Sequence, residues 1–318
     1  MKLRITAQTD ALHFYGHGKL LITGEYFVLD GAQALAVPTQ RGQHLRVKEL
    51  SSSDNTLYWV ALNSRRQMWL NLVFDKQDFS CLNADTPEAH RLSSMLSEAR
   101  KLNPEFLKSE KDVAVETSLE FPNEWGLGSS STLIYTIAQW ANVDGYQLLQ
   151  QTIGGSGYDV ACAGSNHPIL YTLQNNTPET LHIKWKPAFT ENIYFAYLGK
   201  KQLSSEGIKY YREKLSDKTH IANELTRLTG LVLNCNGLSE FEELINEHEN
   251  IVGAALKMMK VKDEHFQDYW GCIKSLGAWG GDFIMLTNTR AGEELTEYLH
   301  SKSIQTVYGW KEMVLAQV

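Results

Sequence analysis

The stretch WGLGSSST, residues 125–132, places two glycines and three serines directly ahead of a helix-like apolar run. Glycines let the backbone approach an anion closely, and free N–H groups at a helix N-terminus bind phosphate. The candidate phosphate-binding residues are Gly126, Leu127, Gly128, Ser129, Ser130, Ser131 and Thr132. We expect Ser129 to cap the helix and a serine hydroxyl to reach a Mg²⁺ held between phosphates. A capped helix without a ligand explains the isolated stretch equally well.

Three further glycine-rich stretches bear on that choice. Lys19 opens an apolar strand in Gly18–Thr39, and Asp159 precedes a short apolar helix in Gly154–Gly164. Ser275–Phe283, SLGAWGGDF, forms a glycine-rich turn before a strand. Taken alone, Lys19 is an ordinary strand-end residue and Asp159 a favourable partner of the helix dipole. A catalytic role for Asp159 needs a nearby cation and a substrate hydroxyl within hydrogen-bond reach.

The elements that must position these residues are strands followed by helices. Alternating and β-rich patterns predict strands at Ala34–Thr39, His44–Leu50, Thr56–Leu62, Gln67–Phe74, Asp112–Phe121, Pro168–Leu173 and Leu181–Lys186, with a loop at QNNTPET between the last two. Helices are expected at Pro87–Leu102, Ser204–Leu215, His220–Leu233 and Ser239–Met259. This order predicts an α+β protein with an N-terminal domain, 1–188, and a C-terminal domain, 189–318.

Composition sets the broad class. The chain has 318 residues, 43% of them hydrophobic, which is a globular composition with room for two domains. The net charge of −7 argues against a nucleic-acid-binding face. No apolar run approaches the roughly 20 residues of a membrane helix, and the start lacks a signal-peptide core. We therefore expect a cytoplasmic protein with no membrane or nucleic-acid partner. Both a monomer and a homodimer are compatible with the sequence.

Together these stretches resemble the signature motifs of the GHMP superfamily of small-molecule kinases, which includes galactokinase, homoserine kinase, mevalonate kinase and phosphomevalonate kinase. GKLLITGEYFVLDG resembles the first motif, PNEWGLGSSST the phosphate-binding motif, and SLGAWGGDF the third. The likeness is closest to the mevalonate and phosphomevalonate kinase branch. It implies that 1–188 is an ATP-binding and catalytic domain like ribosomal protein S5 domain 2, and that 189–318 is a ferredoxin-like, substrate-side domain. ATP and substrate would meet in the cleft between them.

The resemblance also implies roles for individual residues. Asp159 matches the catalytic aspartate that faces the substrate hydroxyl, Lys19 the lysine that pairs with it, and Ser130 the serine that reaches Mg²⁺. The implied co-substrate is ATP with Mg²⁺, and the implied partner is a small anionic substrate. The residues expected on the substrate side are His17, Glu25, Lys200, Gly277, Ala278, Gly280 and Gly281.

Two departures from the motifs weaken a strict mevalonate-kinase assignment. Mevalonate kinases carry a Mg²⁺-binding glutamate on the helix ahead of the aspartate, where this chain has Gln150 and Gln151. Trp279 replaces a small residue of the third motif. The missing acid and the GGD ending favour phosphomevalonate over mevalonate. The alternatives are a GHMP kinase for another sugar or amino-alcohol, a non-catalytic ATP-binding paralogue and, ranked low, a decarboxylase of the same superfamily.

Overall fold

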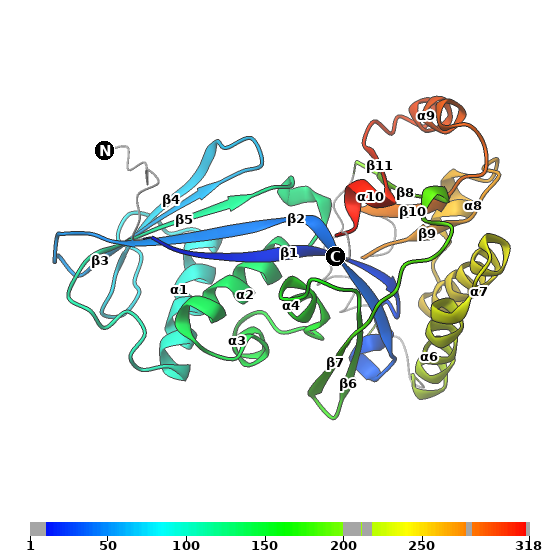
Figure 1. Ribbon diagram of the computed structural model, residues 1–318. Helices are drawn as coiled ribbons and strands as arrows, with labels where there is room; N and C mark the ends of the chain where they lie inside the picture. The colour runs from blue at the N-terminus through cyan, green and yellow to red at the C-terminus, as the bar shows by residue number, and fades with distance from the viewer. Residues whose placement is uncertain (1–10, 200–210, 212–217, 278–281, 316–318) are drawn as a thin grey trace. The chain divides into compact units, whose positions relative to one another are not determined.

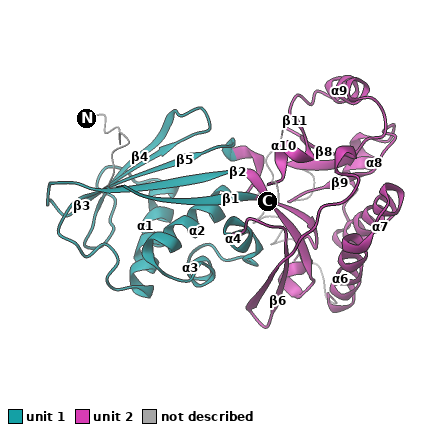
Figure 2. Ribbon diagram, in the orientation of Figure 1, with its two compact units in different colours: residues 1–18, 41–123, 128–164 teal, residues 19–40, 124–127, 165–318 magenta. Residues whose placement is uncertain are grey.

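The computed structural model describes residues 11–199, 211, 218–277 and 282–315, and the chain divides into two compact units (Figure 2). Unit 1 comprises residues 1–18, 41–123 and 128–164, and unit 2 comprises 19–40, 124–127 and 165–318. Strands β1 (Leu12–Thr23) and β2 (Ala34–Glu49) contribute residues to both units. The boundary expected at residue 188 stays a prediction.

Unit 1 is built on a sheet of order β4-β3-β5-β2 (Figure 1). The strands are β3 (Thr56–Leu62), β4 (Met68–Asp75), β5 (Val113–Leu119) and the second half of β2. β3 pairs in parallel with β5, and the other pairs are antiparallel. In β3 Leu57, Trp59 and Ala61 are buried at every second position, as expected where one face of a strand packs on a core.

Four helices cover one face of this sheet (Figure 1). They are α1 (Pro87–Leu102), α2 (Ser129–Ala141), α3 (Gly145–Thr152) and α4 (Tyr158–Ala163). The start of α1 is as predicted, because Pro87 opens the helix and the Thr86 side chain accepts a hydrogen bond from the Ala89 N–H. The core between sheet and helices includes Trp59, Phe74 and Ile137.

Unit 2 contains an antiparallel sheet of order β11-β8-β10-β9. Its strands are β8 (Ile193–Tyr197), β9 (Ile273–Ser275), β10 (Phe283–Thr287) and β11 (Val307–Gly309). Its helices include α6 (Thr219–Asn234), α7 (Leu238–Leu256), α8 (Val261–His265), α9 (Gly292–Ser301) and α10 (Trp310–Met313). A hairpin of β6 (Ile169–Gln174) and β7 (Thr177–His182) pairs with Ala34–Ala36 of β2. Short 3₁₀ turns lie at Phe27–Asp30, Asn123–Trp125 and Thr190–Asn192.

The structure confirms the α+β class and corrects two details of the expected elements. The strands predicted at Ala34–Thr39 and His44–Leu50 are one continuous strand, β2, because Gln40–Gln43 remain extended between them. The loop predicted at QNNTPET shrinks to a turn at Asn175 and Asn176, whose φ angles of 49° and 61° suit a tight hairpin. β7 therefore starts at Thr177, ahead of the predicted strand.

Two further points concern the limits of the described chain. The helix predicted at 204–215 lies, apart from Tyr211, outside the described residues. Within the described residues, every helix is too short or too polar to cross a bilayer.

Candidate active site

The start of α2 has the backbone geometry that its glycines predict. Gly126 and Gly128 have φ angles of +67° and +91°, a left-handed region that side chains rarely adopt. The expected capping by Ser129 is wrong. Gly128 is the N-cap residue and there is no side-chain cap, because the Ser129 hydroxyl instead donates to Asn123 Oδ1 at 2.6 Å. The helix therefore begins at Ser129 with its first N–H groups open to an anion.

The hydroxyls of this first turn differ in what they contact. Ser130 is exposed, whereas Ser131 and Thr132 are buried. Thr132 Oγ1 lies 2.7 Å from Gln43 Oε1 and 3.0 Å from the Ser129 carbonyl, so it stabilises the turn. Ser130 is thus the hydroxyl of this turn that faces solvent.

Asp159 lies in the first turn of α4, a helix that begins at Tyr158 directly after the left-handed Gly157, whose φ is +88°. Its Oδ1 accepts a hydrogen bond from the Val160 N–H at 3.1 Å, and its Oδ2 accepts one from the Ser131 hydroxyl. Two predicted site residues that are 28 positions apart are therefore in direct contact within unit 1. The contact fixes the half-buried carboxylate against the first turn of α2.

Lys19 lies in the part of β1 that belongs to unit 2, and only 8% of it is exposed. Its Nζ donates to the Gly126 carbonyl at 3.0 Å, and its backbone N–H donates to the Leu127 carbonyl at 3.0 Å. The first motif is thus bonded to the glycine stretch of the second motif at both main chain and side chain.

Asp282 is a candidate site residue that the sequence analysis did not single out. Only 4% of it is exposed, and its φ of +55° is unusual for a residue other than glycine. A Cβ added to Gly126 would lie 2.3 Å from Asp282 Oδ2, and one added to Gly277 would lie 3.5 Å away. The aspartate therefore brings the third motif against the second within unit 2. The GGD ending of the motif was the available signal.

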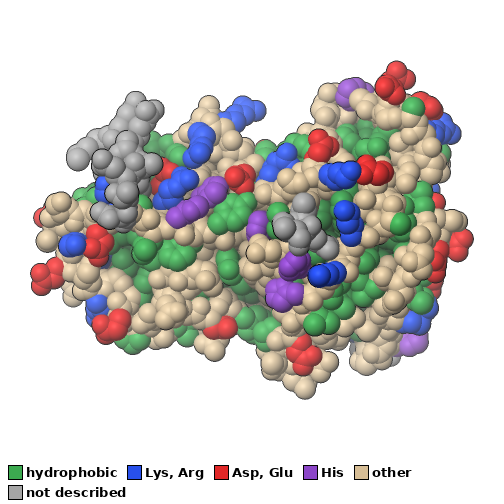
Figure 3. Space-filling view, viewed as in Figure 1, with side chains coloured by type: hydrophobic (Ala, Val, Ile, Leu, Met, Phe, Trp, Pro, Cys, Tyr) green, Lys and Arg blue, Asp and Glu red, His purple; other side chains and the backbone are tan. Residues whose placement is uncertain are grey.

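His17 lies half-buried in unit 1, beside a chain of polar contacts that we call the surface histidine network: His13, Tyr15, His44 and Glu120. The His17 ring packs edge-on against Tyr15. Tyr15 donates to Glu120 Oε2 at 2.7 Å, and the His44 ring bonds Glu120 Oε1 at 3.1 Å and His13 Nε2 at 2.8 Å. Histidine side chains reach the surface on the face shown in Figure 3.

The remaining substrate-side predictions separate into three groups. Glu25 is fully buried in unit 2, with Lys274 Nζ 2.6 Å from its Oε1. Gly277 is described, with a left-handed φ of +73°. The predictions that lie outside the described residues are Lys200, Ala278, Gly280 and Gly281, together with Trp279.

Gln150, at the position where the resemblance expects an acid, has a structural partner. Its Nε2 donates to the Gly155 carbonyl at 2.8 Å. It thereby holds the glycine-rich loop Gly154–Gly157 that leads into Asp159. Within the part of the chain that the structure describes, no group of three or more His, Cys, Asp or Glu residues could hold a metal ion.

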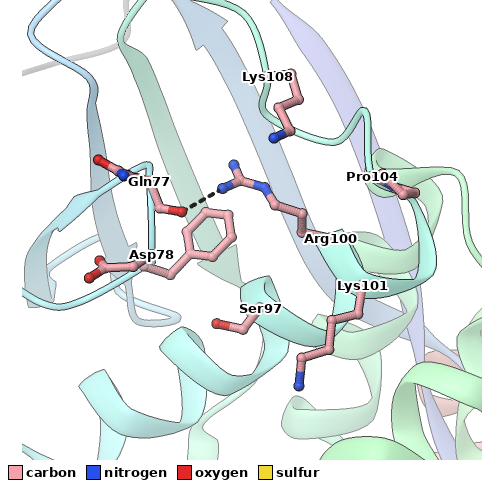
Figure 4. Close-up of a pocket in the computed structure, with 8 residues that line it drawn as sticks. Gln77, Asp78, Ser97, Arg100, Lys101, Pro104 and Lys108 are labelled. Atoms are coloured by element: carbon pink, nitrogen blue, oxygen red, sulfur yellow. Dashed lines mark hydrogen bonds between the residues drawn. The ribbon is translucent and has the colours of Figure 1, made fainter.

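A shallow pocket of about 300 Å³ lies elsewhere in unit 1, between α1 and the loop after β4 (Figure 4). Several cationic side chains line the pocket, but one of them, Arg100, has a structural role. Its guanidinium donates to four carbonyls, among them those of Lys76 at 2.6 Å and Phe106 at 3.0 Å, and it stacks on the Phe79 ring. None of the three motifs lines this pocket, so we assign it no role in catalysis.

The arrangement of elements is that of the GHMP kinase fold. The chain is similar to mevalonate kinase of Methanococcus jannaschii, with 16% identity, a TM-score of 0.66, and coverage of 95% of this chain and 98% of that one. It is also similar to Streptococcus pneumoniae phosphomevalonate kinase in complex with phosphomevalonate and AMPPNP, with 15% identity, a TM-score of 0.67, and coverage of 94% and 99%.

A third similar structure is Lactococcus lactis galactokinase complexed with galactose, with 12% identity, a TM-score of 0.69, and coverage of 95% and 93%. No protein-family model matches the sequence, and no curated protein matches it either. At these identities the likeness establishes the fold, and the chemistry has to be argued from this chain's own residues.

Proposed function

We propose that the protein is an ATP-dependent kinase that phosphorylates a small anionic alcohol or phosphate, with mevalonate or 5-phosphomevalonate as the favoured substrates. The observation that carries the proposal is the contact between the first turns of α2 and α4, where the Ser131 hydroxyl meets Asp159. It joins a helix start suited to phosphate with the carboxylate expected to face the substrate hydroxyl. The fold shared with three small-molecule kinases supports the same chemistry.

Phosphoryl transfer requires mostly positioning and charge stabilisation. The backbone N–H groups that begin α2 would bind the phosphates of ATP, with Gly126 and Gly128 allowing close approach. Asp159 would accept or orient the proton of the attacking hydroxyl. Lys19 would offset the negative charge that develops on the transferred group.

Mg²⁺ fits the residues present. Mg²⁺ keeps several waters and takes much of its coordination from substrate phosphates, so a dedicated protein cage is unnecessary. The exposed hydroxyl of Ser130, in the first turn of α2, is the group that would reach it. When bound, Mg²⁺ would neutralise charge on the phosphates.

The test is release of ADP from Mg·ATP with a panel of mevalonate, 5-phosphomevalonate, homoserine and galactose. Turnover on one mevalonate compound would identify the substrate. Asp159→Asn should lower kcat by about 10²–10³-fold, because one preorganised charge is lost. Asp144→Asn is the matched control, since Asp144 caps α3 through its side chain and asparagine can replace it there.

An ATP-binding protein without turnover is the second candidate, because a glutamine that holds Gly155 stands where the acid is expected. It predicts binding of Mg·ATP by calorimetry together with no ADP release for any member of the panel. Turnover that Asp159→Asn leaves unchanged would contradict the catalytic role of this residue.

A further inference from the structure

Four ionisable side chains form a buried charge cluster in unit 2: Glu25, His248, Glu249 and Lys274. Each is at most 1% exposed. They come from three elements, since Glu25 follows β1, His248 and Glu249 lie on α7, and Lys274 lies on β9. Burying charge is costly unless each charged group is paired and hydrogen-bonded. The number of protons on these four side chains must therefore leave the positive and negative charges of the cluster equal.

Lys274 is the cation of the cluster. Its Nζ lies 2.6 Å from Glu25 Oε1, 3.2 Å from Glu249 Oε1 and 3.1 Å from the Ser275 carbonyl. These three acceptors match the three N–H donors of an ammonium group. Although burial favours the neutral amine, the two carboxyl groups outweigh it and raise the pKa of Lys274.

Glu249 is equipped to be the anion. Its Oε1 accepts from Lys274, and its Oε2 accepts from the Ser275 N–H at 3.1 Å. Glu25 differs, because its Oε2 has no hydrogen-bond donor among the described residues. His248 Nε2 lies 3.3 Å from that oxygen.

His248 is an acceptor at that nitrogen. The Gly24 N–H donates to Nε2 at 3.0 Å, so Nε2 carries the lone pair and the ring proton belongs on Nδ1. Burial, and then the charge of Lys274, lower the pKa of His248, which keeps the ring neutral. A lone pair facing an ionised Glu25 Oε2 would be repulsive, whereas a protonated Oε2 would donate to it.

We propose that Glu25 is a positioning residue that carries a proton on Oε2, shares the single lone pair of His248 Nε2 with the Gly24 N–H in a bifurcated hydrogen bond, and accepts from Lys274 through Oε1. The cluster then holds one cation and one anion, and is neutral overall. Burial raises the pKa of Glu25 to about 7, against a lowering by Lys274 and with a contribution from Glu249. The protonated form therefore persists to near-neutral pH.

Glu25 positions two of the glycine-rich stretches. It lies in the turn after β1, six residues beyond Lys19, while its partner Lys274 directly precedes Ser275, the first residue of the third motif. Lys19 bonds the Gly126 carbonyl, and Asp282 of the third motif lies against Gly126. Any effect of Glu25 on catalysis rests on the proposed kinase function, whereas its effect on folding does not.

The experiment measures urea unfolding of the full chain from pH 5 to pH 8 for wild type, Glu25→Gln and Glu249→Gln. Glutamine mimics a protonated glutamic acid, so Glu25→Gln should unfold near the wild-type midpoint at pH 5. Glu249→Gln should unfold at much lower urea, because it leaves Lys274 without an anion. Glu243→Gln, an exposed position on the same helix, is the matched control and should resemble wild type.

The pH dependence gives the sharper readout. The pKa of Glu25 is higher in the folded state than its ordinary 4.5, so its stabilising contribution is full below pH 4.5 and is lost as the pH rises through 7. Glu25→Gln lacks this loss. Its folding constant relative to wild type should therefore rise on the order of 50-fold from pH 5 to pH 8.

The proposal would be overturned if Glu25→Gln lowered the urea midpoint strongly while Glu249→Gln lowered it only slightly. It would also be overturned if the folding constant of Glu25→Gln relative to wild type did not change with pH, or if Glu25→Gln failed to fold. The ¹⁵N chemical shifts of His248 in the wild-type protein provide an independent check and should show a neutral ring protonated at Nδ1. An Nε2–H ring would contradict the proton assignment. With an active substrate, the kcat/KM of wild type should fall as the pH rises through 7, whereas that of Glu25→Gln should not show this fall. Absence of all turnover would count against the kinase function alone.

Discussion

The surface histidine network of unit 1 and the buried charge cluster of unit 2 use the same side-chain types in opposite surroundings. In the network, Glu120 is 39% exposed and bonds His44 at 3.1 Å. In the cluster, Glu25 is fully buried, and its Oε2 lies 3.3 Å from the ring of His248. Both pairs are glutamate and histidine, yet the pKa shifts of the two glutamates differ in sign.

The difference comes from the number of donors that reach each carboxyl group. Burial acts to raise the pKa of Glu120, but hydrogen bonds from Tyr15, the Gly42 N–H and His44 outweigh it and lower the pKa. At Glu25 the donors are Lys274, at Oε1, and the backbone of Glu25 itself, and burial outweighs them and raises the pKa. A glutamate–histidine contact therefore says little about protonation until the donors to both oxygens are counted.

The largest effect is expected for Lys274→Met. Removing the cation leaves Glu249 as an unpaired buried anion, which should cost about 3–5 kcal/mol of unfolding free energy. Urea unfolding measures this. Lys311→Met, at a solvent-exposed ion pair with Glu191, should change stability by less than about 0.5 kcal/mol. Equal losses for both variants would remove the distinction between buried and exposed charge.

A smaller loss is expected for Gly126→Ala. Residue 126 has a left-handed φ of +67°, so a residue with a side chain at this position should lower the free energy of unfolding by about 1–2 kcal/mol. The new Cβ would also displace the Asp282 carboxylate. Gly230→Ala, within α6 and with no atom within 4 Å of the new Cβ, should instead gain about 0.5–1 kcal/mol. Thermal unfolding of both variants tests the pair, and a neutral Gly126→Ala would contradict the close packing of Asp282.

In the surface network, Tyr15→Phe should cost about 0.5–1.5 kcal/mol, the range for one hydrogen bond. The variant removes the donor that lies 2.7 Å from Glu120 Oε2 and so weakens the cause of the lowered pKa. Urea unfolding at pH 7 measures the loss. Tyr58→Phe, on β3 in the same unit, provides a comparison outside the network. A loss of stability as large as that of Lys274→Met would show that the network contributes as much to the free energy of unfolding as the buried charge cluster does.

The smallest effect is expected for His13→Gln. Burial, and then the charges of His44 and Arg46, lower the pKa of His13, so the unfolded chain takes up the proton more readily. The stability linked to this ring is therefore present above pH 6.5 and declines as the pH falls. The free energy of unfolding of His13→Gln should match that of wild type at pH 8 and fall slightly less between pH 7 and pH 5. If it fell as steeply as in wild type, the lowered pKa of His13 would be contradicted.

Local patterns predicted much of the fold because they are local. A threonine before a proline, at residues 86 and 87, predicted α1 at its observed bounds, and the glycines of the second motif predicted a close approach of the backbone ahead of α2. The capping by Ser129 failed, because the choice between Gly128 and Ser129 depends on a contact with Asn123 in the preceding turn.

The buried charge cluster was beyond reach of the sequence. His248 and Glu249 belong to the stretch NEHEN, which looks like a solvated face of a helix. Lys274 reaches Glu25 across 249 positions of the chain, and only the packing of α7 and β9 in unit 2 makes these charges internal. For Asp282 the GGD ending was a signal in the sequence, but its contact with Gly126 became visible only in the folded chain.

The interrupted course of the chain has a consequence for how such a protein can evolve. Each unit is assembled from three separate segments, and the chain passes from one unit to the other inside β1, inside β2, within the 3₁₀ turn Asn123–Trp125, just ahead of α2 and just after α4. No single crossover in the gene can therefore exchange one unit and leave the other whole. A protein recombined at one point would combine segments of the same unit from two different parents. We therefore expect sequence change in such proteins to proceed by substitution and loop insertion.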